Sequence, residues 1–111
     1  MATNNPGAER ARRVTPRLFV RKVARADMAE ASAWYWGRRA GLGQEFLEAA
    51  SVTLAAIEAQ PQRFVIAIDD IRMAPLHRFP YVIYFVELPR HTSVLAVVHG
   101  RRSPRVWQQR R

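Results

Sequence analysis

The spacing of apolar residues changes along the chain, and each change predicts a different element of secondary structure. In residues 17–23, the apolar Leu18 and Val20 alternate with the basic Arg17 and Arg21. A period of two residues is typical of a β-strand, because successive side chains of a strand point to opposite faces. This segment is therefore the first predicted strand.

A helical period follows the first strand. Asp27 can accept hydrogen bonds from the first turn of a helix, and Glu30 completes a capping-box-like pair. Gly41 and Gly43 are expected to end this helix. Three consecutive aromatic residues, 34–36, cannot all face one way, so we expect two in the core and one in solvent. The residues of the stripe at helical spacing are Met28, Ala31, Trp34, Tyr35 and Arg38.

A second helix is predicted to begin near Gln44 and to end at Pro61. Glu45 lies in its first turn, where a negative charge interacts favourably with the helix dipole. Two amphipathic helices joined by a short glycine turn form a helical hairpin. The apolar face of the second helix consists of Phe46, Leu47, Ala50, Leu54 and Ile57.

The rest of the chain has the pattern of β-structure. Residues 64–68 and 71–76 are short predicted strands, and Pro75 in the second indicates an edge or a bulge. Residues 81–88 and 92–99 are longer strands joined by a short hairpin loop. Both are apolar on both faces, so we expect central strands that are covered on both sides. The helical hairpin covers one face, and either the C-terminal segment or a partner protein covers the other.

This order of elements predicts an α+β domain. We expect a small antiparallel sheet with an N-terminal strand and with the helical hairpin packed on one face. The domain comprises residues 17–111, a length sufficient for one modest core. Residues 1–16 are polar and basic and contain Pro6 and Pro16, which indicates a flexible tail.

Positive charge is concentrated at the two ends of the chain. The formal net charge is +9, of which residues 1–16 contribute +2, residues 17–99 contribute +2 and residues 100–111 contribute +5. The base composition of a gene can favour arginine over lysine, and Lys22 is the single lysine, but this bias does not explain the clustering. The clustering favours a polyanionic or acidic partner.

Other features narrow the class of protein. The sequence contains no cysteine, which excludes disulfides and thiolate metal sites. No apolar run reaches membrane-spanning length and the N-terminus lacks a signal-peptide core, so we expect a cytoplasmic protein without a membrane partner. The three histidines lack the spacing of a metal site, and carboxylates do not cluster with them. We therefore expect no metal ion and no cofactor.

Four segments, in this order along the chain, resemble the RelE/ParE toxins of type II toxin–antitoxin systems. The first two are ARADMAEASAWYW and GLGQEFLEAASVTLAAIEAQP, which contain the predicted helical hairpin. The third ends in Arg-Phe-Pro-Tyr at the start of a strand, residues 78–81. The fourth contains His-x-x-Arg-x-Pro-x-x-Trp, residues 99–107. The resemblance covers residues 17–110, and the basic tail lies outside it.

The resemblance implies the α+β fold and a partner, an acidic antitoxin whose C-terminal part wraps the toxin in a hetero-oligomer. It leaves the target open. RelE-like members cut messenger RNA, usually on the ribosome, whereas ParE-like members poison DNA gyrase and are not nucleases. One fold can host several functions, so the residues of the site must decide between them.

RNA cleavage without a metal ion needs one group that takes the 2′-hydroxyl proton, another that protonates the 5′-oxygen, and cations that stabilise the phosphorane. Arg78 and Arg101 are the first candidates for the cations, because each flanks the end of a central strand and arginine can bind phosphate through two donors. In the resemblance, both match positions where RelE-like nucleases carry a phosphate-handling arginine. The alternative for Arg78 is to hold its turn or to pair with Asp69 or Asp70.

His99 ends the last predicted strand and is the candidate acid or base, since histidine titrates near neutral pH. Its alternative role is to hydrogen-bond the backbone at the strand end. Trp107 lies where some RNA-cutting relatives place a tyrosine; it can stack on a base or cover the second face of the sheet, but it has no hydroxyl. The candidates for binding RNA or the antitoxin are Arg72, Arg102, Arg105, Trp107 and Tyr81.

These observations are compatible with three functions. The first is a ribosome-dependent endoribonuclease toxin, which fits the basic ends and the arginines. The second is a ParE-like gyrase poison. It is favoured because Trp107 stands in place of the tyrosine and because the lysines that the best-known RelE-like enzymes bring to the site are missing: Lys22, the single lysine, lies in the first predicted strand. The third is a basic nucleic-acid-binding module without toxicity, which charge alone supports.

Deleting residues 2–14 is expected to leave the melting temperature nearly unchanged, because a segment of this composition buries little apolar surface. Thermal unfolding of the full-length and shortened chains measures the difference. A drop of more than about 4 °C, roughly 1 kcal/mol for a domain of this size, would show that the tail packs on the domain.

Overall fold

The structure, a computed structural model, describes residues 17–110, so the predicted tail of residues 1–16 lies outside the described residues. The predicted α+β fold class is confirmed. No helix of the described part is long and apolar enough to cross a membrane. The elements are, in order, β1 (Leu18–Val20), α2 (Lys22–Trp36), α3 (Leu42–Ala59), the 3₁₀ helix η1 (Pro61–Arg63), β2 (Ile66–Ile68), β3 (Ile71–Pro75), β4 (Tyr81–Glu87), β5 (Thr92–His99) and α4 (Arg105–Gln108).

The five strands form one sheet in the order β1-β5-β4-β3-β2, so β4 and β5 are central as predicted. The ladders β2–β3, β3–β4 and β4–β5 are antiparallel, whereas β1 pairs with β5 in parallel. Pro75 lies beyond the residues of β3 that pair with β2, on a locally open edge. The missing proline N–H therefore costs the sheet no ladder hydrogen bond, which confirms the edge interpretation of Pro75.

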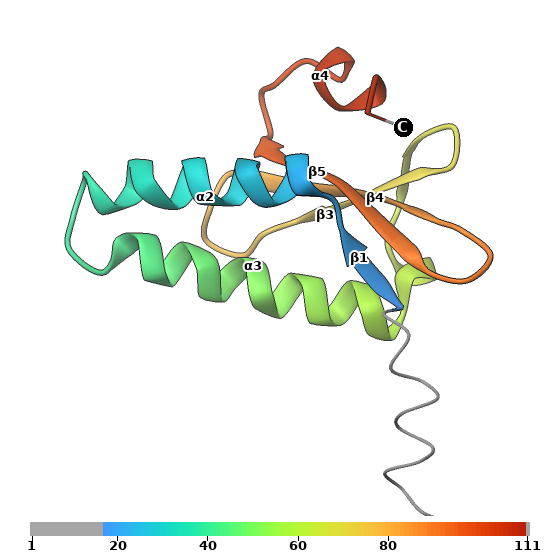
Figure 1. Cartoon of the computed structure of the whole chain (residues 1–111), viewed down its shortest axis with the longest axis horizontal. Coiled ribbons are helices and arrows are strands. Elements are labelled where there is room, and N and C mark those ends of the chain that lie inside the picture. The colour runs from blue at the N-terminus through green and yellow to red at the C-terminus, as the bar shows by residue number, and fades with distance from the viewer. Residues whose placement is uncertain (1–16, 111) are drawn as a thin grey trace, which may run out of the picture.

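Helices α2 and α3 cover one face of the sheet, as predicted (Figure 1). The centre of this core is aromatic. The ring of Phe46, from α3, stacks on Tyr35 of α2 at 5.4 Å between centroids and meets Phe79 edge-on at 5.4 Å. Phe46 is fully buried, so it joins the two helices to the loop that precedes β4.

The two glycines between the helices have different roles, and the prediction that both end α2 is wrong. Helix α2 already ends at Trp36. Gly41 caps α3 with a φ of 85°, a conformation that a residue with a Cβ rarely adopts. Gly43 lies inside α3, where a Cβ would sit 2.0 Å from Cδ1 of Trp36. Glycine is needed there because the helices approach closely.

The predicted start of the first helix is also wrong. Helix α2 begins at Lys22, directly after β1, and Arg21 precedes it in an extended conformation. Asp27 lies in the second turn of α2 and caps nothing, because its carboxylate is bound to the sheet instead. The aromatic run differs from expectation as well: Tyr35 is buried, whereas Trp34 and Trp36 are 53% and 50% exposed.

The C-terminal helix α4 covers the second face of the sheet (Figure 1), one of the two covers predicted for it. Trp107 is 2% exposed and stacks on Tyr84 of β4, with ring centroids 3.9 Å apart and an angle of 14° between the planes. Its indole Nε1–H is buried without a hydrogen-bond partner among the described residues. Burial in this stack raises the pKa of Tyr84.

A bulge in β5 interrupts the alternation of its side chains between the two cores. Tyr84 pairs with Ala96 and Phe85 pairs with Val94, so Leu95 is the extra residue. Leu95 and Ala96 both pack in the second core, while Val94 and Val97 belong to the helix-side core. The bulge also changes which backbone groups of β5 face the strand's outer edge.

That outer edge is open beyond Val94, because β1 ends at Val20. Asp27 provides the hydrogen-bond acceptor that a neighbouring strand would otherwise supply: its Oδ2 accepts the backbone N–H of Val97 at 2.9 Å. The guanidinium of Arg110 pairs with the same carboxylate at 2.6 Å and donates to the backbone oxygen of Leu95 at 3.3 Å. We call Asp27, Val97 and Arg110 the Asp27 clamp. It joins α2, β5 and the C-terminus.

Replacing Asp27 with alanine is expected to lower the free energy of unfolding by about 2–3 kcal/mol, since it leaves the Val97 N–H and the Arg110 guanidinium without their acceptor. The side chains of Asp27 and Arg110 are only 13% and 20% exposed, so water compensates incompletely. Chemical denaturation measures the loss. Glu30→Ala is the matched control on the same helix; it removes an exposed carboxylate and is expected to change stability by less than about 0.5 kcal/mol.

Replacing Trp107 with alanine is expected to cost about 3 kcal/mol or more, because a buried ring is lost from the second core. Trp107→Phe keeps a stacked ring and removes a buried N–H that has no partner, so it is expected to cost far less. Denaturation of both variants separates packing from polar effects. Equal losses of unfolding free energy in the two variants would contradict the role of the Trp107 ring in covering the second face of the sheet.

Candidate functional site

Four of the predicted site residues lie at one end of the sheet. The ladder places Tyr81, the first residue of β4, beside His99, the last residue of β5. The backbone N–H of Gly100 donates to Pro80 at 2.8 Å, which holds the chain after β5 against the loop that contains Arg78. Arg101 follows directly. The sequence motifs around residues 78–81 and 99–102 therefore form one site.

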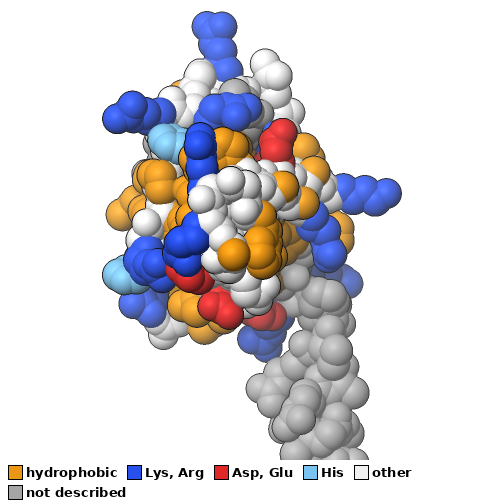
Figure 2. Space-filling view, turned by 90° about the vertical axis from the view of Figure 1, so that its left-hand side faces the viewer, with side chains coloured by type: hydrophobic (Ala, Val, Ile, Leu, Met, Phe, Trp, Pro, Cys, Tyr) orange, Lys and Arg blue, Asp and Glu red, His pale blue; other side chains and the backbone are white. Residues whose placement is uncertain are grey.

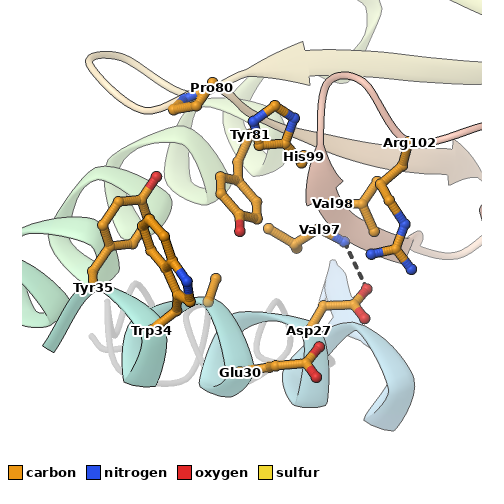
Figure 3. A pocket seen from close by; sticks show the side chains of 11 residues that line it. Asp27, Glu30, Trp34, Tyr35, Pro80, Tyr81, Val97, Val98, His99 and Arg102 are labelled. Atoms are coloured by element: carbon orange, nitrogen blue, oxygen red, sulfur yellow. Dashed lines mark hydrogen bonds between the residues drawn. The ribbon is translucent and has the colours of Figure 1, made fainter. Parts of the chain in front are cut away.

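A pocket of about 620 Å³ opens beside this end of the sheet, between α2 and β5. In Figure 3, aromatic side chains stand on one side of the pocket, Arg102 stands on the other, and the carboxylates of α2 lie along its lower edge. The pocket is lined by Asp27, Glu30, Ala31, Trp34, Tyr35, Pro80, Tyr81, Val97, Val98, His99 and Arg102.

Aromatic rings in edge-to-face contact form one wall of the pocket. The ring of Tyr81 lies 5.5 Å from His99 and 6.1 Å from Tyr35, and Tyr35 lies 5.0 Å from Trp34. Burial, together with the charge of Glu30, raises the pKa of Tyr81. The Tyr81 phenol is therefore protonated at neutral pH and can donate a hydrogen bond.

The imidazole of His99 has one nitrogen engaged. Its Nδ1 accepts the backbone N–H of Arg101 at 3.1 Å, which is the backbone role considered for this histidine. An accepting Nδ1 places the proton of the neutral ring on Nε2. Nε2 makes no hydrogen bond with the described residues, so its N–H can donate a hydrogen bond to a ligand.

Arg78 is held by an ion pair, but with a partner other than the two aspartates considered. Its Nη2 lies 3.0 Å from Oε1 of Glu45, and Arg39 approaches the same carboxylate at 3.3 Å. Hydrogen bonds from Arg78 and then Arg39 lower the pKa of Glu45. Arg78 has a φ of 75°, so its backbone also shapes the turn before β4.

The arginines after β5 are free to meet an anion. Arg101, Arg102 and Arg105 are exposed, and in the described part of the chain their side chains form no ion pair or hydrogen bond. Figure 2 shows lysine and arginine side chains projecting around the rim of one face of the molecule, with most of its acidic side chains in the lower part. Cations that lack internal partners are available to phosphate.

Two predicted binding residues lie apart from this cluster. Arg72 donates to the backbone oxygen of Phe64 at 2.7 Å and lies 3.8 Å from Glu87. It pairs with Phe85, four residues from Tyr81 along β4 and thus about 13 Å away. Trp107 is buried, so in this conformation it cannot stack on a base.

Sequence reasoning missed the α2 side of the pocket. Asp27 was assigned to a helix cap and Trp34 to a core stripe, whereas Glu30 had only a capping role. All three line the pocket from one helix face, at spacings of three and four residues. That spacing was visible in the sequence, but the partner that the face would meet was not. Among the described residues, no group of three or more His, Cys, Asp or Glu could hold a metal ion.

Comparisons with known proteins agree with the fold. No protein-family model matches the sequence, and no curated protein matches it. A chain from a solved structure described as the chromosomal ParDE TA system from P. aeruginosa is similar to 76% of this chain and 95% of its own length, with a TM-score of 0.66 and 13% sequence identity. This chain therefore has the fold of a protein from a ParDE system, as its resemblance to the RelE/ParE toxins implied.

Proposed function

We propose that this chain is the toxin of a type II toxin–antitoxin pair and that it cleaves messenger RNA without a metal ion. The observation that carries the proposal is that His99 lies close in the chain to Arg101 and Arg102, and that, among the described residues, its Nε2 and their guanidinium groups have no partner. The fold of a ParDE-system protein supports the toxin class. A histidine and free arginines at one site suit a phosphodiester substrate.

In this proposal the arginines bind the scissile phosphate and stabilise the charge that develops on it. Arg101 and Arg102 act directly. Arg78 adds a third cation, because an exposed pair with Glu45 is weak and a phosphate can replace the carboxylate. The planar fork of each guanidinium matches two phosphate oxygens.

Two proton transfers complete the reaction. The neutral His99 ring donates a hydrogen bond from Nε2–H to the leaving 5′-oxygen, which takes its proton from solvent water. The 2′-hydroxyl proton goes to Glu30, since it is the pocket carboxylate that is not engaged in an ion pair, and the 2′-oxygen then attacks phosphorus. The Tyr81 hydroxyl, which stays protonated, donates a hydrogen bond within the pocket.

The partner in this proposal is an acidic antitoxin. Its carboxylates neutralise Arg78, Arg101 and Arg102, which lie at the same end of the sheet. An antitoxin bound there would also block access to His99. Association driven by opposite charge is fast and sensitive to salt.

A ParE-like gyrase poison is the second candidate. It is favoured by the burial of Trp107, the residue at the position where some RNA-cutting relatives carry a tyrosine. It is also favoured by the similarity to a ParDE-system chain. In this alternative the same arginines bind gyrase and catalyse nothing.

Arg101→Ala is expected to lower the cleavage rate by about a hundredfold or more, because the arginine acts mainly in the transition state. Arg101→Lys is expected to restore part of the rate, since lysine keeps the charge but loses the fork. Primer extension on a translated message measures cleavage. Arg90→Ala, an exposed arginine in the loop between β4 and β5, is the control and is expected to cleave like the wild type.

New 5′ ends within codons for the wild type and the control, but not for Arg101→Ala, would establish the nuclease. Intact messenger RNA in all variants, together with a DNA-damage response, would reject cleavage in favour of the gyrase alternative. If expression of the wild-type chain does not inhibit growth at all, the toxin class itself is rejected.

A further inference from the structure

The second edge of the sheet, formed by β2, is uncovered. All six residues from Val65 to Asp70 are exposed. They include three large apolar side chains, Val65, Ile66 and Ile68, which are 64%, 54% and 37% exposed. The β2–β3 hairpin projects from the side of the molecule opposite the α2–α3 turn (Figure 1). A contiguous exposed apolar edge of this kind indicates a contact surface.

The backbone of this edge is able to accept another strand. The N–H of Met73 donates to the oxygen of Val65 at 3.0 Å, so the polar groups of Val65 face β3. Because the direction alternates along a strand, the N–H and C=O of Ile66 face away from the sheet. Ile66 therefore presents one donor and one acceptor at the open edge.

The edge carries few of the features that usually prevent pairing. Residues 65–68 contain no charge and no proline, and all four are exposed, so no helix of the described part covers them. The register of β2 shifts between Ile66 and Ile68, which confines regular pairing to the surroundings of Ile66. Any interface here is small, so we expect it to be weak.

Charge indicates which partner fits. The segment runs from basic Arg63 through an apolar centre to acidic Asp69, so an antiparallel copy of the same segment complements it. Arg63 and Asp69 are both exposed, and among the described residues neither side chain has an ion-pair partner. An interface between identical patches must be self-complementary in this way.

We propose that a second copy of this chain pairs antiparallel with β2 about a twofold axis at Ile66. The two Ile66 residues exchange a closed pair of backbone hydrogen bonds, and Val65 of each copy lies beside Ala67 of the other. Arg63, the last residue of η1, and Asp69, in the turn after β2, flank this pair at its two ends, so Arg63 of each copy lies near Asp69 of the other and forms an ion pair with it. The two sheets become one continuous sheet.

Sedimentation velocity of the full chain tests the proposal. We expect a monomer–dimer equilibrium in the micromolar range, as befits an interface below about 1,200 Å². Ile66→Lys should give a monomer, because it brings two like charges together at the axis. Val52→Lys is the matched control: Val52 is an exposed apolar residue of α3, 70% exposed, and the dimer should persist. Thermal unfolding checks that each variant is folded.

A charge exchange tests the register. Arg63→Glu and Asp69→Lys should each weaken the dimer about tenfold or more, because each sets like charges opposite one another. A mixture of the two variants should form a heterodimer of about wild-type affinity, since both ion pairs are restored between unlike copies. Amide exchange at Ile66 should slow as wild-type concentration rises.

A chain that stays monomeric at all concentrations would overturn the proposal. A dimer that survives Ile66→Lys, or one that is lost with Val52→Lys, would place the contact elsewhere and would overturn it too. Single charge variants that dissociate without recovery in the mixture would reject the proposed register.

Discussion

One carboxylate, that of Asp27, joins three parts of the fold at one point. It accepts the backbone N–H of Val97 and pairs with Arg110, so a turn of α2, the open edge of β5 and the C-terminus meet at one point. The constraint behind this arrangement is the short β1, which leaves part of a central strand without a neighbour. An unpaired N–H in that position would be costly, and a side chain satisfies it instead.

The candidate site depends on the same contact between Asp27 and β5. Asp27 lies in the wall of the pocket, and the strand that it binds ends two residues later at His99. Arg21 donates to the backbone oxygen of Arg110 and, through Nε, to Ser93 at 2.9 Å, which ties the C-terminus to β5 a second time. Helix α4 is thereby kept over the second face, and Arg102, between β5 and α4, remains at the pocket.

Most of the fold could be predicted from the sequence, because the period of apolar residues reflects burial directly. The central strands and the helical hairpin followed from it, and the C-terminal segment was one of the two covers expected for the second face. The start of α2 could not be predicted, because aspartate is a residue type favoured at helix N-caps. Only the tertiary fold shows that the carboxylate of Asp27 binds Val97 instead. The site was half predicted: the motifs contain His99 and Arg102, but nothing local reveals that Trp34 would line the same pocket.

Amide hydrogen exchange at Val97, measured by NMR in the wild type and in Asp27→Asn, tests the Asp27 clamp most directly. The wild-type Val97 amide should exchange as slowly as the amides of the β4–β5 ladder, although no strand lies on the outer side of β5 to which this amide points. In Asp27→Asn, which weakens the acceptor and the ion pair, it should exchange much faster while ladder amides near Thr92 change little. Fast exchange at Val97 in the wild type, or no response to the substitution, would contradict the clamp.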